Sequence, residues 1–254
     1  MTQACRTALS TTTGGENAGL LLDFYLFETG DEGKARRTLF KRTMEASWAC
    51  VEIYRAAFHR WKGEVKPDQS KKIHVAGRLI VGLGAGTVLE TGITLHHTYG
   101  VPVIPGSALK GLAAAYCAKV WGETGETYRR EPVGAAYKAL FGTGDDSGCI
   151  VFHDAWILPE SLGNGGGLLL DVMTPHHTDY YMKGGQEHPP ADTDKPVPVT
   201  FLSVAGDFRL AVSCIAGTTE QRKEWSALAM ELLLQAVGEW GAGGKTSGGY
   251  GRMA

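Results

Sequence analysis

The sequence predicts an α+β protein whose core follows the order strand, helix, strand, strand, helix, strand. Three observations support this. Alternating apolar residues mark half-buried strands, and apolar residues three and four positions apart mark helices that pack on them. A composition of 43% hydrophobic and 20% charged residues is typical of a globular protein. No internal repeat or linker divides the 254 residues, so we predict one domain.

Residues 1–70 are predicted to form an N-terminal extension of this core. Residues 1–19 are rich in Thr, Ser and Gly and are expected to be disordered, and the apolar run 20–27 is expected to be a strand or a helix. Asp31 can cap a helix that continues to about residue 62. That helix carries one apolar stripe, formed by Met44, Trp48, Val51, Tyr54, Phe58 and Trp61.

The first strand of the core is predicted at residues 72–83, where apolar positions alternate with His74 and Arg78. An extended stretch follows at 88–96. Because Pro105 disfavours helix at the residue before it and Ser107 is a suitable N-cap, a helix is predicted over 107–121. A polar loop at 122–134 leads to a short helix, 135–141, that ends at Gly142.

The second half is predicted to hold a strand at 149–158, an irregular insertion at 159–200, and two strands at 197–204 and 207–215. The turn Gly206-Asp207 predicts that these two strands form a hairpin. An amphipathic helix at 220–240 and a short strand at 249–252 complete the order. This order is typical of a ferredoxin-like, RRM-like core with both helices on one face of the sheet.

Composition excludes several classes of function. The net charge of −2 is unlike that of most nucleic-acid-binding domains, so any RNA must be attracted locally. The five cysteines are scattered, which argues against a disulfide framework or a cysteine zinc site. No apolar run is long enough to span a membrane and no signal peptide is recognised, so a cytoplasmic protein with no membrane partner is expected. We expect neither a cofactor nor a metal.

The glycine-rich segment 241–251 is the most informative motif. Successive glycines can present backbone N–H groups to phosphate oxygens, and an aromatic ring can stack on a base. Although Gly-Lys-Thr occurs at 244–246, Glu239 replaces the first glycine of a P-loop, and the segment follows a helix instead of opening one. The predicted RNA contacts in this segment are Gly241, Gly243, Gly244, Lys245, Thr246, Ser247, Tyr250 and Arg252.

A second candidate anion site lies at the start of the helix 107–121. Ser107 at the N-terminus and Lys110 in the first turn are suited to a phosphate, although an ordinary capped helix explains them equally well. Arg78, on the polar face of the first strand, is expected to assist.

Together these motifs resemble the RAMP superfamily of CRISPR proteins over residues 72–252. The resemblance rests on Gly-Leu-Gly-Ala-Gly (82–86), Ile-Pro-Gly-Ser-Ala-Leu-Lys-Gly (104–111), Phe-Gly (141–142), Gly-Cys-Ile-Val-Phe-His-Asp-Ala (148–155) and the C-terminal glycines. Residues 91–102 and 171–181 are also similar to the family of the sixth subunit of the type III-B (Cmr) effector complex. One departure is that Ala113, Ala114 and Ala115 stand where the family often has an arginine, which leaves more of the phosphate contact to Lys110.

The resemblance implies a non-catalytic subunit in antiviral defence that binds guide CRISPR RNA. It implies a position near the 3′ end of the guide, where the subunit caps a filament of backbone subunits. Other RAMP subunits and small subunits of the effector complex are the implied partners, with target RNA nearby.

Two other classes of function remain open. A metal-independent RAMP endoribonuclease would use His176 or His96 as general base. A protein-only scaffold would use the acidic insertion 159–200 against a neighbouring subunit. The basic run at 34–42 is interpreted first as a solvated helix face and second as a contact for RNA or a partner.

Overall fold

The computed structural model describes residues 17–24, 32–84, 91–163, 165–174, 176–177, 180, 189–192, 194–196 and 198–254. It confirms an α+β protein. Of the lead predicted to be disordered, residues 1–16 lie outside the described residues, and the prediction is wrong for Ala18 and Gly19, which belong to a helix. No described helix combines the length and the apolar character that a membrane crossing requires.

The described part of the N-terminal extension contains the helices α2 (Ala18–Phe24), α3 (Glu32–Ala49) and α4 (Val51–Glu64). The prediction of one helix from residue 31 to 62 is wrong, because Cys50 takes a non-helical ψ of 0° between α3 and α4. The Cys50 thiol lies 3.1 Å from the carbonyl oxygen of Tyr99, so this break faces another segment of the chain. A 3₁₀ turn, η1 (Pro67–Gln69), then leads into the first strand.

The main sheet is antiparallel and has the order β1 (Ser70–His74), β7 (Asp207–Cys214), β4 (Ala155–Ile157) and β2 (Val103–Ile104). Strand β3 (Ile150–Phe152) also pairs with β7. Residues 252–254 continue the sheet beyond β1, since His74 and Ala254 exchange two backbone hydrogen bonds of 2.8 and 2.9 Å. The short terminal strand predicted at 249–252 is therefore displaced to 252–254.

Two predicted strands are shorter than the sequence pattern indicates. The strand predicted at 72–83 ends at His74, and Gly77 then takes a φ of +104°, which turns the chain away from β7. Leu79 pairs instead with Val204. The strand predicted at 149–158 is divided into β3 and β4, because the Asp154 carboxylate between them turns to accept a hydrogen bond from Gly106.

A second sheet combines a strand from the segment predicted to be irregular, 159–200, with the strand predicted at 197–204. Strand β5 (Gly167–Met173) pairs antiparallel with β6 (Val199–Ala205), and we call this pair the ribbon. The predicted hairpin of residues 197–204 and 207–215 is wrong, since β6 pairs with β5 while β7 belongs to the main sheet. The chain changes sheets at Gly206, where φ is +133° and a Cβ would lie 2.6 Å from the Cβ of Ser161.

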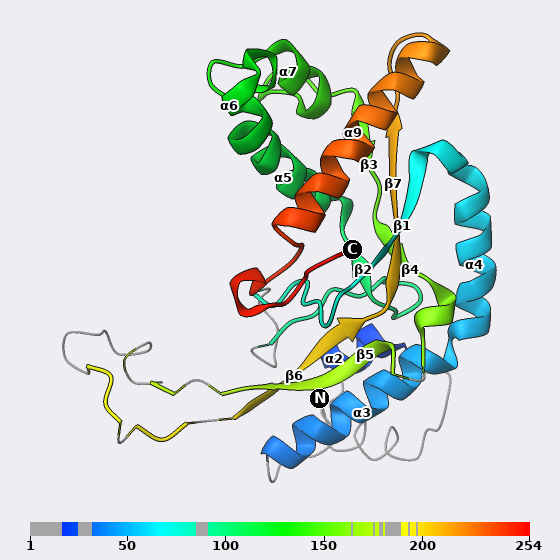
Figure 1. Ribbon diagram of the computed structural model, residues 1–254. Coiled ribbons are helices and arrows are strands. Elements are labelled where there is room, and N and C mark those ends of the chain that lie inside the picture. Colours follow the sequence, from blue (N-terminus) through cyan, green and yellow to red (C-terminus); the bar gives the residue numbers. More distant parts are fainter. Residues whose placement is uncertain are drawn as a thin grey trace.

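The helices α5 (Gly106–Tyr116) and α9 (Thr219–Glu239) pack on one face of the main sheet (Figure 1). A π-helical turn, η2 (Cys117–Trp121), and two short turns, α6 (Gly122–Thr124) and η3 (Glu126–Tyr128), extend α5 toward α7 (Ala135–Phe141). The predictions of helices at 135–141 and 220–240 are confirmed to within one residue, and a capping box between Thr218 and Gln221 starts α9.

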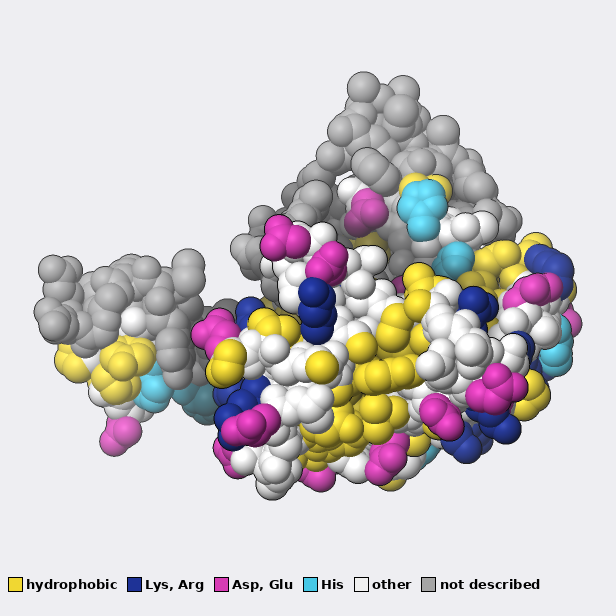
Figure 2. Space-filling model, turned by 90° about the horizontal axis from the view of Figure 1, so that it is seen from above, with side chains coloured by type: hydrophobic (Ala, Val, Ile, Leu, Met, Phe, Trp, Pro, Cys, Tyr) yellow, Lys and Arg dark blue, Asp and Glu magenta, His cyan; other side chains and the backbone are white. Residues whose placement is uncertain are grey.

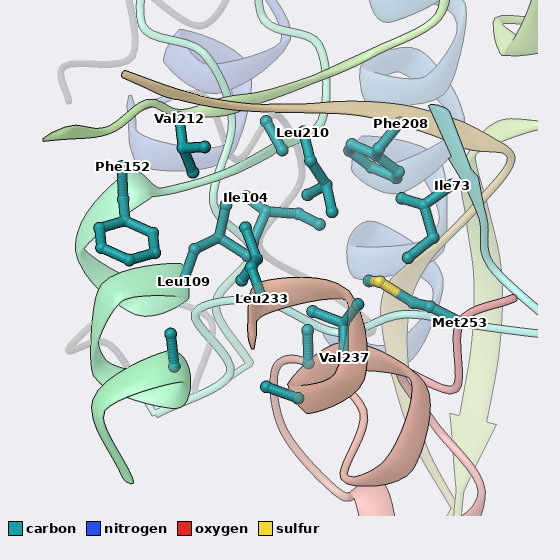
Figure 3. Close-up of a cluster of buried hydrophobic side chains, with 14 of the residues drawn as sticks. Ile73, Ile104, Leu109, Phe152, Phe208, Leu210, Val212, Leu233, Val237 and Met253 are labelled. Carbon is teal, nitrogen blue, oxygen red and sulfur yellow. The ribbon is translucent and has the colours of Figure 1, made fainter. Parts of the chain in front are cut away.

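The core lies between this sheet face and the two helices, as Figure 3 shows. Its buried side chains include Ile73, Ile104, Leu109, Phe152, Phe208, Leu210, Val212, Leu233, Val237 and Met253. Helix α4 packs near the other sheet face through Trp61, whose ring stacks on that of Trp156 at 5.2 Å. The glycine segment 241–251 follows directly on α9, one of the two helices that cover this core.

Candidate nucleic-acid interface

The glycine-rich segment 241–251 is an ordered loop that is docked on residues 78–80. The N–H of Gly244 donates to the carbonyl oxygen of Ile80 at 2.8 Å, and the N–H of Gly251 donates to that of Arg78 at 2.7 Å. A third bond, 2.9 Å from the N–H of Ala242 to the carbonyl oxygen of Gly251, closes the loop on itself. These bonds fix the backbone that a ligand would meet.

Close approach of backbone to backbone explains two of the glycines. A Cβ on Gly243 would lie 2.1 Å from the carbonyl oxygen of Ile80, and one on Gly251 would lie 1.8 Å from that of Ala242. Both glycines also have a positive φ, +79° and +68°, which a side chain disfavours. The loop can therefore dock only with glycine at these two positions.

The tip of the loop contains backbone N–H groups that are not hydrogen-bonded within the described chain. Lys245 takes the left-handed conformation, with φ of 57° and ψ of 36°, and a 3₁₀ turn, η5 (Thr246–Gly248), follows it. Within the described chain, the N–H groups of Lys245, Thr246 and Ser247 have no acceptor. Three successive unbonded donors next to an exposed lysine have the arrangement of an anion-binding nest, and phosphate binding at this segment stays a prediction.

A pocket of about 330 Å³ separates the loop from α5. The apolar side chains of Ala108 and Leu112 line it on the helix side, and Trp240 and the loop residues 241–243 and 246 line it on the other. Apolar walls next to free backbone donors suit a planar group that carries a phosphate. The sequence prediction did not include Trp240 or this pocket, because their proximity to α5 depends on the packing of α9.

Tyr250 ties the loop to the ribbon. Its hydroxyl donates to the Asp171 carboxylate on β5 at 3.1 Å, and its ring lies 6.2 Å from that of Phe201 on β6. Burial, followed by the nearby Asp171 charge, raises the pKa of Tyr250. The half-buried ring is thus held against protein on one side, and its stacking on a base remains a prediction.

The arginines near the loop differ in role. The Nη1 atom of Arg78 is buried and has no hydrogen-bond partner among the described residues. The positive charge of Arg78 partly offsets the rise in the pKa of Tyr250. Arg252 instead donates from Nη1 to the carbonyl oxygen of Glu239 at 2.9 Å, at the end of α9. The structure therefore brings Arg78, Lys245 and Tyr250 to one region and turns Arg252 toward a helix terminus.

The prediction that Ser107 caps the helix is wrong. Helix α5 starts one residue earlier and its N-cap is Pro105. The first helical N–H, that of Gly106, donates to Asp154 Oδ1 at 2.7 Å, so a carboxylate already lies at this helix end. Gly106 is required there because a Cβ would lie 2.1 Å from the carbonyl oxygen of Phe152.

Lys110 is not brought to the glycine loop. An α-helix turns about 100° per residue, so Lys110 lies about 200° around α5 from Ala108, which lines the pocket. Lys110 and Lys245 therefore face different surroundings, and the two predicted anion sites do not form one continuous site through these side chains.

The histidines that were considered as general bases have local partners. Burial is the main cause that lowers the pKa of His96, and its Nδ1 accepts the N–H of Thr98 at 3.2 Å. His177 Nδ1 lies 2.8 Å from Asp194 Oδ2, while the ring centroid of the exposed His176 lies 6.5 Å from that of His177. Among the described residues, no group of three or more His, Cys, Asp or Glu side chains could hold a metal.

Comparison with known proteins identifies the family. The model of the RAMP superfamily matches residues 72–254. The chain belongs to the RAMP superfamily. The sequence resemblance stated for residues 72–252 is thereby confirmed.

This RAMP protein is 31% identical over 229 residues to the CRISPR system Cmr subunit Cmr6 of Pyrococcus furiosus. The alignment covers 72% of this chain and 66% of that relative, so it spans just under two thirds of the relative's length.

Among solved structures, the RAMP chain matches one chain of the cryo-EM structure of the type III-B Cmr-beta bound to cognate target RNA. The TM-score is 0.57 at 20% identity, over 92% of this chain and 84% of that one, which indicates a common fold. The crystal structure of Cmr6 from Pyrococcus furiosus matches with a TM-score of 0.43 at 29% identity, over 73% and 96% of the two chains.

The match to the RAMP superfamily covers residues 72–254 and leaves out the N-terminal helices. The docked glycine loop, α5, α9 and both sheets except the first residues of β1 lie within it, whereas α2, α3 and α4 precede it. The family assignment therefore applies to the candidate interface but leaves the N-terminal helices without an assigned role.

Proposed function

We propose that this protein is a non-catalytic subunit that binds guide CRISPR RNA in a type III-B RNA-targeting effector complex. It would cap the backbone filament near the 3′ end of the guide, with other RAMP and small subunits as neighbours and target RNA close by. Membership of the superfamily and the similarity to Cmr6 support the complex. The contact with RNA rests on the geometry of the glycine loop.

One observation carries the RNA contact. The docked loop holds the free N–H groups of residues 245–247 and the exposed Lys245 next to a pocket with apolar walls. A phosphate would bind the nest and the lysine, and the adjacent base or ribose would enter the pocket beside Trp240. Recognition of this kind depends on the backbone and is largely independent of base sequence.

We also propose that residues 72–254 form a ferredoxin-like core within one domain, with residues 1–70 as extension and 159–200 as insertion. The hydrogen-bonded order of residues 252–254, β1, β7 and β3 with β4 supports it, since this is the order of a βαββαβ sheet. Helices α5 and α9 on one face agree with that arrangement (Figure 1).

RNA–protein crosslinking with mass spectrometry on the assembled complex tests the proposal. We expect crosslinked peptides that contain Lys245 and Trp240, and a smaller yield at Lys110, because Trp240 lines the pocket and Lys245 belongs to the loop that borders it. The matched variant is Lys245→Ala, with Lys62→Ala on the exposed side of α4 as a control of equal charge change. Stoichiometric protein without any crosslink in residues 240–250 would favour the protein-only scaffold instead.

The endoribonuclease alternative has its own test. The imidazole lone pair of His96 is engaged by the Thr98 N–H, which leaves Nε2 as the protonated nitrogen and speaks against that residue as a general base. His176 is exposed and keeps this possibility open. Cleavage of RNA by the isolated chain that disappears in His176→Ala would establish the enzyme and refute the non-catalytic proposal.

A further inference from the structure

A second basic surface lies on the N-terminal helix α3, outside the region matched to the RAMP superfamily. A hollow of about 530 Å³ lies between α3 and the start of β6, and we call it the α3 groove. Its walls include Lys34, Arg37, Thr38 and Lys41 from α3 and Thr200 from β6. None of the described residues that line it is acidic.

The helical repeat places these cations on one face. Residues 34, 37 and 41 are spaced by three and four positions, which puts them on one side of a helix. The opposite side of α3 is anchored, since Leu39 and Phe40 are each 1% exposed and pack in a cluster with Leu202. Packing of the apolar side therefore fixes the basic side toward the groove and the solvent.

Two cations of the groove, Arg37 and Lys41, are available for an anionic ligand. Lys34, Arg37 and Lys41 are exposed, and Arg37 and Lys41 form no ion pair within the described residues. Thr38 and Thr200 add hydroxyl groups at the same surface. Since the whole chain carries a net charge of −2, this concentration of one sign is local.

The ribbon connects the α3 groove to the glycine loop. The register pairs Asp171 with Phe201 and Leu170 with Leu202, so alternate residues point to opposite faces. One face carries Asp171 and Phe201 toward Tyr250 of the loop, and the other carries Leu170 and Leu202 toward α3. Figure 1 accordingly shows α3 on one side of the ribbon and the C-terminal loop on the other.

The face of the molecule seen in Figure 2 is less suited to a polyanion. On the face seen in Figure 2, hydrophobic side chains form a central band, and acidic and basic side chains are interspersed around it. A surface of mixed sign does not attract a phosphate backbone over several residues. The α3 groove combines three cations with the absence of acidic lining residues among those described.

We propose that the α3 groove binds the phosphate backbone of single-stranded RNA, in addition to the contact at the glycine loop. At a rise of 1.5 Å per residue, Lys34 and Lys41 lie about 10 Å apart along α3, which matches about three phosphates of one strand. The inference rests on the proposed function, because it assigns a second contact to the same RNA. The RNA would then contact both faces of the ribbon.

The test measures binding of a labelled, unstructured single-stranded RNA to the full chain across about 50 to 200 mM salt. The variant is Arg37→Ala with Lys41→Ala, and both side chains are exposed. Each phosphate contributes a slope of about −0.7 to log K against log salt, so two lost contacts weaken binding about 25-fold at about 0.1 M salt. The salt slope is expected to fall by about 1.4.

The control is Arg60→Ala with Lys62→Ala on α4, which removes the same charge from exposed positions outside the groove. We expect it to bind as the wild type does, and the charge-preserving Arg37→Lys with Lys41→Arg to bind nearly as well. Circular dichroism and a thermal midpoint establish that each variant folds.

The outcomes separate the inference from the proposed function. Wild-type affinity in the groove variant, with weaker binding in Lys245→Ala, would overturn the α3 groove and leave the glycine-loop contact intact. An equal loss in the α4 control would also overturn it, since net charge alone would then explain the effect. A wild-type chain that binds no RNA at the lowest salt would overturn both proposals.

Discussion

Substitution of Gly243 by alanine tests the docking of the glycine loop most directly. The new Cβ would have to move away from the carbonyl oxygen of Ile80, which would lie 2.1 Å from it, and the backbone φ of +79° disfavours a side chain. The conformation costs about 1–2 kcal/mol, and loss of the bond from Gly244 to Ile80 adds about 0.5–1.5 kcal/mol. We expect a loss of about 2–3 kcal/mol in the free energy of unfolding.

Two other glycines of the loop separate these contributions. Gly249 has a φ of +89° but open space around its Cβ position, so Gly249→Ala should lose only about 1–2 kcal/mol. Gly248 has neither a positive φ nor a contact closer than the Cβ of Lys245 at 4.0 Å, so Gly248→Ala should be nearly neutral.

Thermal unfolding of the three variants by calorimetry provides the measurement. A difference of 1 kcal/mol corresponds to about 2–4 °C in a chain of this size, so Gly243→Ala should melt several degrees below Gly248→Ala, with Gly249→Ala between them. If Gly243→Ala and Gly249→Ala melted together, the contact with Ile80 would contribute nothing and the docked loop would be refuted.

Two further predictions concern the attachment of the ribbon and of β7. Tyr250→Phe removes the hydroxyl that donates to Asp171, and the urea midpoint should fall by the equivalent of about 1 kcal/mol; an unchanged midpoint would show that ring packing alone holds the ribbon. Burial raises the pKa of Asp207, but bonds from Lys72 and His74 outweigh it and hold that pKa below its ordinary value. The stabilisation is therefore present above the ordinary carboxyl pKa and is lost as pH falls through the folded pKa, so Asp207→Asn should be less stable than wild type near about pH 7 and equal to it in strong acid. A stability gap that persists in acid would contradict this ion pair as its source.

Elements whose signals are local were predictable. The helix at 135–141 ends at Gly142, which takes a positive φ of 82°, and the helix at 220–240 begins one residue after the capping residue Thr218. Each helix boundary depends on capping side chains and glycines within a few residues of it. The local sequence is therefore enough to predict where these helices begin or end.

Strand pairing was less predictable, because its partners are distant in sequence. Asp207 follows Gly206 in a turn that is typical of a hairpin, yet β6 pairs with β5 and β7 with β1. The partner of β6 begins at Gly167, in a segment whose glycines predict loops. The alternation of apolar residues and the residues of a turn are local features. They do not determine which of two sheets a strand joins.

The candidate interface was predictable in part for the same reason. The glycine segment, Lys245 and the free backbone donors follow from composition and spacing. Other features of the interface join residues that are 48 or more positions apart in the sequence. They are the pocket beside Trp240, the bond from Tyr250 to Asp171, and the carboxylate of Asp154 at the start of α5. Sequence patterns do not record such contacts.

The sequence by itself determined the α+β class, the superfamily, the two boundary-marked helices and the loop that carries the candidate site. Only the tertiary structure decided which sheet each strand joins, that Lys110 turns away from the loop, and that α3 presents its cations beside the ribbon. The physical reason is that backbone conformation responds to neighbours along the chain, whereas the surroundings of a side chain depend on which elements bury their apolar faces together.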